Sequence, residues 1–159
     1  MGKPTPSQTV GPFFGFALPF EGDATAAALD LAETVRIEGQ LLDGDGQPVS
    51  DGLLEAWSGE QFARCRTDAE GSFHFVVGKP RPQPGEAPHV NVFVFARGLL
   101  RHLATRIYFP DEAGANAADR VLQAVDASRR QTLVASADGS VLRFDVRLQG
   151  ENETVFFAL

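Results

Sequence analysis

Residues 87–98 read APHVNVFVFARG, and this stretch decides the predicted fold. Apart from His89 and Asn91 the strand is apolar, with Pro88 before it and Gly98 after it. A short run that is apolar on both faces and bounded by such residues predicts a central strand, covered on both sides. Side chains alternate along a strand, so His89 and Asn91 are expected on one face. A pair of histidines there could bind a metal ion, but asparagine is a poor ligand. The pattern leaves three interpretations open: a metal site, a former metal site or an ordinary strand.

Further short strands are predicted at 35–41, 53–57, 62–67, 72–77, 103–109, 132–136, 141–148 and 154–159. The turn signals DAEG (68–71) and ADGS (137–140) predict hairpins, and DGDG (43–46) predicts a tight turn. The four prolines of 78–88 predict a loop, and the alanine-rich residues 111–126 predict a short helix. The pattern predicts an all-β fold, an antiparallel β-sandwich with little helix.

The first 34 residues differ in character from the rest. They are rich in Pro, Gly and Ala and show little periodicity, so residues 1–34 are predicted to form an extended arm, with a helical turn around 24–31. Residues 35–159 are predicted to form the sandwich. A Phe-Phe pair near each end, at 13–14 and 156–157, is unusual for chain termini, and we expect both ends to dock, the arm on a partner subunit.

Composition limits the possible functions. The chain has 159 residues, which suits one domain, and 43% of them are hydrophobic. A net charge of −7 argues against a nucleic-acid partner. The single cysteine, the lack of a visible signal peptide and the short apolar runs lead us to expect a cytoplasmic protein with no membrane contact.

Six segments, in order along nearly the whole chain, resemble the intradiol ring-cleavage dioxygenases. They are TPSQTVGPFF (5–14), LEAWSGE (54–60), RTDAEGSFHF (66–75), APHVNVFVFARG (87–98), TRIYF (105–109) and RFDVRLQGENETVFF (143–157). The FARG and QGENETVFF pieces are similar to the alpha subunit of one heteromeric member. The resemblance implies αβ protomers in a higher oligomer, a beta subunit that holds Fe(III) through two tyrosines and two histidines, and an alpha subunit of the same fold without those ligands. It implies cleavage of 3,4-dihydroxybenzoate with O2 to 3-carboxy-cis,cis-muconate.

A count of ligands agrees with an alpha subunit. Fe(III) is a hard cation that suits tyrosinate, yet Tyr108 is the only tyrosine and lies outside the family's ligand segments. Phe62 is the aromatic residue nearest the first expected tyrosine, and residues 78–86 contain none. His89 matches the first histidine of the family's pair and Asn91 replaces the second. The former metal site is therefore the favoured interpretation, with iron bound by the beta subunit and not by this chain.

The resemblance also assigns residues to the substrate pocket. It implies that Thr9, Gly11, Pro12 and Phe13 of the arm line a pocket wall, although GPFF could instead anchor the arm in a core. Arg97 would bind the substrate carboxylate, for which a guanidinium is a good partner. A solvated arginine at the end of a strand is the alternative.

Other functions fit the same residues less well. A non-enzymatic β-sandwich binding module is an alternative, but such modules usually expose Trp and Tyr, of which this chain has one each. An independent intradiol enzyme lacks its ligands. A zinc triad of His74, His89 and His102 matches no usual ligand spacing. Cys65 is expected to be a core thiol, since no Cys-His motif accompanies it.

Overall fold

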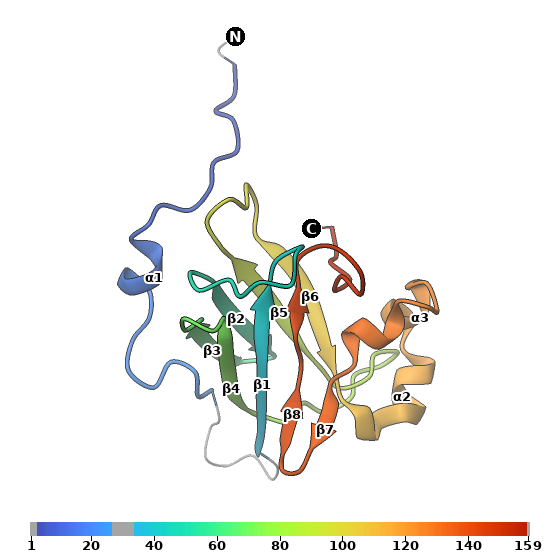
Figure 1. Ribbon diagram of the computed structural model, residues 1–159. Helices are drawn as coiled ribbons and strands as arrows, with labels where there is room; N and C mark the ends of the chain where they lie inside the picture. Colours follow the sequence, from blue (N-terminus) through green and yellow to red (C-terminus); the bar gives the residue numbers. More distant parts are fainter. Residues whose placement is uncertain (1–2, 27–33, 159) are drawn as a thin grey trace.

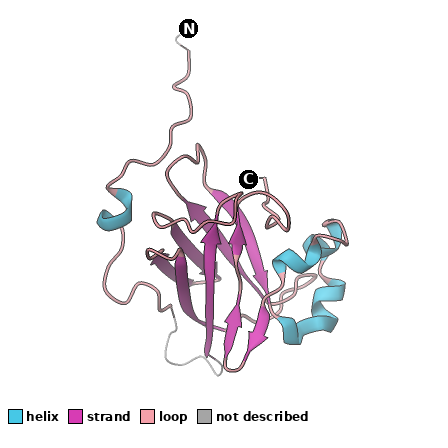
Figure 2. Ribbon diagram, viewed as in Figure 1, coloured by secondary structure: helices cyan, strands magenta, loops and turns pink. Residues whose placement is uncertain are grey.

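The computed structural model describes residues 3–26 and 34–158, which form two packed sheets, a covering of short helices and an extended arm (Figures 1 and 2). The strands are β1 (Thr34–Leu42), β2 (Leu53–Ser58), β3 (Gln61–Arg66), β4 (Ser72–Gly78), β5 (His89–Phe95), β6 (Leu103–Tyr108), β7 (Ser136–Asp138), β8 (Val141–Arg143) and β9 (Val146–Arg147). The helices are α1 (Phe14–Ala17), η1 (Pro110–Glu112), α2 (Ala113–Ala118), α3 (Arg120–Ala124) and η2 (Arg130–Leu133). Among the described residues, no helix has the length and apolar character needed to cross a membrane.

The two sheets confirm the predicted β-sandwich. One has the order β4-β1-β8-β7, with β9 also paired to β1, and the other has the order β3-β2-β5-β6. All pairs are antiparallel except β1 with β8 and with β9, which are parallel. The predicted strand at 141–148 is interrupted between β8 and β9, where the Phe144 N–H donates a hydrogen bond to the Glu38 carbonyl at 2.8 Å. Gly39 permits this approach, because a Cβ there would lie 1.8 Å from the Phe144 carbonyl oxygen.

β5 is central in its sheet, as predicted, because it pairs with β2 on one side and β6 on the other. Val90, Val92 and Val94 point into the core between the sheets and are at most 1% exposed. His89 and Asn91 lie on the opposite, outer face and are half-buried. α2, α3 and η2 cover part of this outer face and build a second small core around Tyr108, which is fully buried.

The predicted hairpin at 68–71 is wrong. The turn itself forms, since the Asp68 N–H donates to the Ser72 carbonyl at 3.1 Å and Gly71 takes a φ of +70°. However, β3 and β4 belong to different sheets, so the chain crosses from one layer to the other here. The true hairpin joins β2 to β3 at residues 59–60, where Gly59 has a φ of +58°. The hairpin predicted at 137–140 is confirmed between β7 and β8.

The predicted last strand, 154–159, does not form over the described residues up to 158. Phe157 makes one bridge, donating its N–H to the Ala104 carbonyl at 2.8 Å. The far end of the β6 edge is already used, because the Ala135 N–H donates to the Tyr108 carbonyl at 3.0 Å. The predicted strand at 132–136 is also shifted, since residues 130–133 form η2 and the strand starts at Ser136. The predicted helix at 111–126 is present as two short α-helices after a 3-10 turn.

The arm is extended over residues 3–13 and contains one helical turn, α1, which the sequence did not predict. The turn predicted at 24–31 lies largely outside the described residues, and residues 24–26 run beside β4, with the Ala26 N–H donating to the Val76 carbonyl at 2.8 Å. The division at residue 34 and the packing of the arm on a partner stay predictions.

Candidate substrate-facing site

The arm and the end of β5 meet at one corner of the molecule. Just after β5, the turn of residues 96–99 is closed by a bond from the Leu99 N–H to the Ala96 carbonyl at 3.3 Å, and Gly98 has a φ of +92°. The Gly98 N–H donates to the hydroxyl of Thr9 at 2.8 Å. This contact links residues 89 positions apart and places Thr9 beside Arg97 in space. Two of the predicted site residues are therefore brought together.

Arg97 forms an ion pair through its Nε with Asp51, a partner that the sequence did not indicate. Its side chain remains 61% exposed, against 29% for Asp51. An exposed ion pair contributes little to stability, so Asp51 orients the guanidinium more than it buries it. The arrangement leaves both interpretations of Arg97 open, the substrate-binding one and the solvated one.

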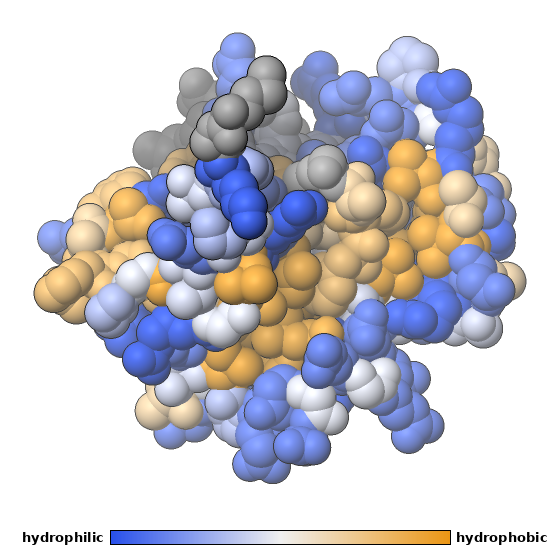
Figure 3. Space-filling model, turned by 90° about the horizontal axis from the view of Figure 1, so that it is seen from above, coloured by the Kyte–Doolittle hydropathy of each residue, from blue (hydrophilic) through white to orange (hydrophobic). Residues whose placement is uncertain are grey.

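Gly11, Pro12 and Phe13 form the turn that leads into α1, where the Phe14 N–H donates to the Gly11 carbonyl at 3.2 Å. Phe13 is 68% exposed and stacks edge-on against Phe16, with ring centroids 5.2 Å apart. The alternative that GPFF anchors the arm in this chain's own core therefore fails for Phe13. Other large exposed apolar residues are Phe16, Leu18 and Phe20, in or just after α1, and Leu100, just after the turn of residues 96–99. Seen from above, broad apolar areas reach the surface (Figure 3).

The positions that match the family's metal ligands carry no ligand set. On the outer face, Phe62 packs against Trp57 with centroids 4.4 Å apart, and neither side chain offers an anionic oxygen. Nδ1 of His89 forms a hydrogen bond with the Ala87 carbonyl at 2.9 Å. Burial lowers the pKa of His89, which favours the neutral ring. Asn91 follows on the same face. These residues do not suit Fe(III), which needs hard, anionic oxygen donors.

Other candidate ligands do not gather either. Among the described residues, no three His, Cys, Asp or Glu side chains lie close enough to hold a metal ion. His74 is on β4 of the other sheet, whereas His102 packs against Phe93 with centroids 5.3 Å apart. Cys65 is 8% exposed, and burial raises the pKa of its thiol, which fits a core thiol. The zinc triad is thus not formed.

A charged network beside His89 was missed at the sequence level. Arg106 on β6 donates from Nη1 to Oε2 of Glu86 at 3.0 Å and to the Tyr108 hydroxyl at 3.4 Å. Tyr108 donates to Oδ1 of Asp119 at 3.1 Å, and both are fully buried. Burial raises the pKa of Tyr108 to about 12, so its hydroxyl stays protonated. The alternation of Arg106 and Tyr108 in TRIYF indicates that both side chains lie on one face of a strand. It does not indicate their partners, which are distant in sequence.

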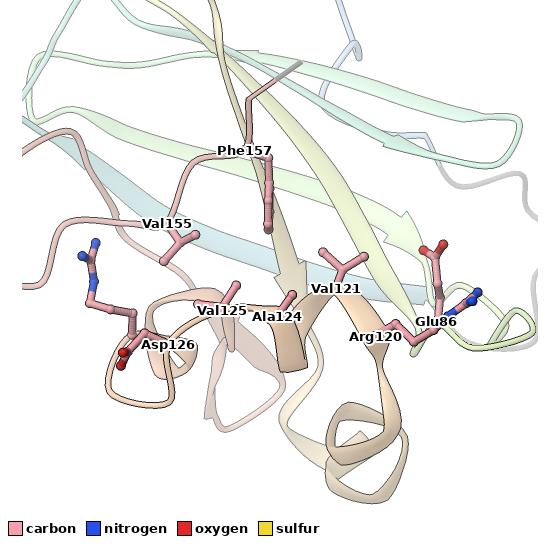
Figure 4. Close-up of a pocket in the computed structure, with 9 residues that line it drawn as sticks. Glu86, Arg120, Val121, Ala124, Val125, Asp126, Val155 and Phe157 are labelled. Atoms are coloured by element: carbon pink, nitrogen blue, oxygen red, sulfur yellow. The ribbon is translucent and has the colours of Figure 1, made fainter.

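An open groove of about 750 Å³ runs between α3 and the C-terminal segment (Figure 4). Its walls are Val121, Ala124, Val125, Val155 and Phe157, with Glu86 and Arg120 at one end and Asp126 at the other. Arg129 also lines the groove. The C-terminal Phe pair packs on the chain itself, Phe156 against the main core and Phe157 against the second. The groove contains none of the predicted substrate-facing residues, so it is a separate feature.

Comparison with solved structures identifies the fold. No family model matches the chain. The dioxygenase domain of a dioxygenase carbohydrate-binding protein fusion from Streptomyces sp. SirexAA-E matches with a TM-score of 0.64 at 23% identity, covering 93% of this chain and 99% of that one. An intradiol ring-cleavage dioxygenase from Tetranychus urticae matches with a TM-score of 0.57 at 14% identity, covering 95% and 96%. The fold is that of the intradiol dioxygenases, which are iron-dependent enzymes.

Sequence relatives narrow the class. The protocatechuate 3,4-dioxygenase alpha chain of Burkholderia cepacia is 44% identical, covering 98% of this chain and 97% of the relative. The alpha chain of Pseudomonas putida is 40% identical, covering 96% and 95%. The beta chain from Burkholderia cepacia is 27% identical, covering 86% and 74%. The chain belongs to the family of protocatechuate 3,4-dioxygenase alpha chains, and the alpha and beta names describe a heteromeric dioxygenase.

Proposed function

We propose that this chain is the iron-free subunit of a heteromeric dioxygenase that cleaves 3,4-dihydroxybenzoate with O2 to 3-carboxy-cis,cis-muconate. The observation that carries the proposal is the absence of a tyrosinate and histidine ligand set, in a chain that matches alpha chains over nearly its whole length. A beta chain supplies the Fe(III), and this chain supplies part of the substrate pocket. The αβ pairs assemble into a higher oligomer.

The reaction divides between the two chains. Fe(III), when bound by the beta chain, makes the catecholate susceptible to O2, and the ring opens between its two hydroxyl-bearing carbons. Both oxygen atoms of O2 enter the product, so no outside reductant is required. The residues of this chain bind, orient and shield the substrate, which raises the rate by holding the reacting ring in place.

The geometry of the arm supports a role in the pocket wall. Thr9 fixes the arm to the turn after β5, so the following residues Gly11, Pro12 and Phe13 project from a defined point. Within residues 3–26 and 34–158, and apart from its two chain neighbours, no atom lies within 4 Å of where a Cβ of Gly11 would be, so the packing of these residues does not require glycine there. A glycine in open space is suited to the close approach of a ligand or a partner chain.

Arg97 is suited to the carboxylate of the substrate, which is an anion at neutral pH. A guanidinium can form two parallel hydrogen bonds to a carboxylate, and the exposed side chain keeps room for that contact. Asp51 would hold the guanidinium at the rim of the pocket through Nε.

The proposal is tested by producing the chain with and without its beta chain. We expect iron and O2 uptake with 3,4-dihydroxybenzoate only when both chains are present, and a colourless preparation from this chain alone. Metal analysis and an oxygen electrode measure the two outcomes. About one iron per lone chain, with a visible tyrosinate-to-iron band, would contradict the proposal.

A further inference from the structure

We infer that the guanidinium of Arg106 takes the place of the metal ion in this chain, as a fixed internal cation on the outer face of β5 and β6. The inference rests on the proposed function in one respect only, which is the match of His89 and Asn91 to the histidine pair of the metal-binding chains. Everything else follows from the contacts of this chain. The role is that of a positioning residue, because Arg106 acts by holding other groups in place.

The register of the sheet places Arg106 opposite Asn91, the position that matches the second histidine of the family's pair. Asn91 of β5 lies directly opposite Arg106 of β6, and His89 lies opposite Tyr108. Directly opposed residues of an antiparallel pair project from the same face with their Cβ atoms about 4.5–5.5 Å apart. A cationic side chain therefore borders the position of the missing second histidine.

The surroundings of Arg106 resemble those of a bound cation. Its side chain is 18% exposed, and Nη1 contacts Oε2 of Glu86 at 3.0 Å and the oxygen of Tyr108 at 3.4 Å. The same carboxylate oxygen of Glu86 lies 3.7 Å from Nε2 of His89. One carboxylate oxygen is thus shared between a guanidinium and the matched histidine.

The contacts continue into the covering helices. Tyr108 donates to Asp119, which also accepts the N–H of Ala87 at 2.8 Å and that of Leu122 at 2.7 Å. The guanidinium thereby joins β6, the segment before β5 and the start of α3, three elements that a metal ion could join through its ligands. Arg106 is paired directly with Glu86 and is linked to Asp119 through the Tyr108 hydroxyl, whereas Arg120 lies near Glu86 at the end of the groove.

Charge repulsion gives the inference a consequence. Asn91→His would add a second histidine on the face of β5 that carries His89, which lies near Glu86. Together these are the donor types of a two-histidine, one-carboxylate metal site. With Arg106 in place, a divalent ion would meet a positive charge and a carboxylate that is already paired. With Arg106→Gln as well, the Glu86 carboxylate is released from that ion pair and the positive charge opposite position 91 is gone.

The first experiment measures thermal unfolding of the chain copurified with its beta chain. We expect Arg106→Gln to lower the unfolding midpoint by about 5 °C or more, and Arg106→Lys, which keeps the charge, to recover over half of that loss. Arg143→Gln is the matched control, because Arg143 pairs with Glu38 at 2.9 Å on the other sheet with its side chain 51% exposed. A loss for Arg106→Gln no larger than for Arg143→Gln, or equal losses for Gln and Lys, would overturn the inference.

The second experiment counts Zn²⁺ taken up per αβ pair, relative to the unsubstituted complex, after excess ion is removed. We expect Asn91→His alone to add none, Asn91→His with Arg106→Gln to add about one, and a further Glu86→Gln to abolish that uptake. Equal uptake with and without Arg106, or none in the double variant, would overturn the inference. Neither readout involves ring cleavage, so failure here is distinct from failure of the proposed function.

Discussion

The two ends of β5 carry similar chemistry in opposite settings. Near His89, the neighbouring Arg106 is mostly buried and bonded to Glu86, while helices cover the adjoining Tyr108. After Phe95, Arg97 is exposed and lies beside the arm through the contact of Gly98 with Thr9. The difference indicates that the end of β5 near His89 is tied into the fold, whereas the end at Arg97 is open to solvent.

The largest effect expected from a single substitution is at the buried end. Asp119→Ala would leave the hydroxyl of Tyr108 and the N–H groups of Ala87 and Leu122 buried without an acceptor. Unsatisfied buried donors cost about 1–3 kcal/mol each, so we expect a loss of roughly 3–5 kcal/mol in unfolding free energy. Denaturant unfolding of the complex measures it. Asp126→Ala, which removes an exposed carboxylate bonded to Ser128, is the control and should cost much less than Asp119→Ala.

The pH dependence of stability tests the role of Asp119 at the buried end. Burial opposes ionisation of Asp119, but hydrogen bonds from Leu122, Ala87 and Tyr108 outweigh it, and its pKa lies below the ordinary 3.8. A carboxyl whose folded-state pKa is lowered stabilises the fold above its unfolded pKa and loses that contribution as pH falls through the folded value. The difference in stability between wild type and Asp119→Asn should therefore narrow below pH 3.8, and a constant difference would remove the charge from the explanation.

An intermediate effect is expected at the open end. Arg97→Ala should lower kcat/KM for 3,4-dihydroxybenzoate by about 10- to 150-fold, since a charge-assisted contact is worth about 1.5–3 kcal/mol. Iron content and assembly should not change. Catechol, which lacks the carboxylate, is the control substrate and its turnover should hardly change in steady-state assays. Equal losses with both substrates would show that Arg97 has a structural role. No loss with either would show that Arg97 is a solvated residue outside the site.

The sequence predicted some of this contrast and missed the rest, for physical reasons. The absence of a pair of tyrosine ligands can be predicted by counting residues, because the chain has one tyrosine and no fold can supply the oxygen that phenylalanine lacks. β5 was predictable because its apolar pattern is local. The hairpin at 68–71 was wrong because turn residues fix the local bend but not which sheet the next strand joins. The network of Arg106 was missed because side-chain contacts in the folded chain join Glu86, Arg106 and Asp119, which are separated in sequence.

The smallest effect is expected from the contact that joins the arm to β5. Thr9→Val keeps the shape of the side chain and removes the oxygen that accepts from Gly98. A neutral hydrogen bond at an exposed position contributes about 1 kcal/mol, so the arm should lose its fixed position without the complex coming apart. If the arm lines the pocket, kcat/KM for 3,4-dihydroxybenzoate should fall by about 5-fold, with catechol affected to the same extent because the arm shapes the pocket and does not bind the carboxylate. Thr5→Val, an exposed substitution on the same arm, is the control and should have no effect. Unchanged kinetics in Thr9→Val would separate the arm from the pocket and leave Arg97 as the contribution of this end of β5.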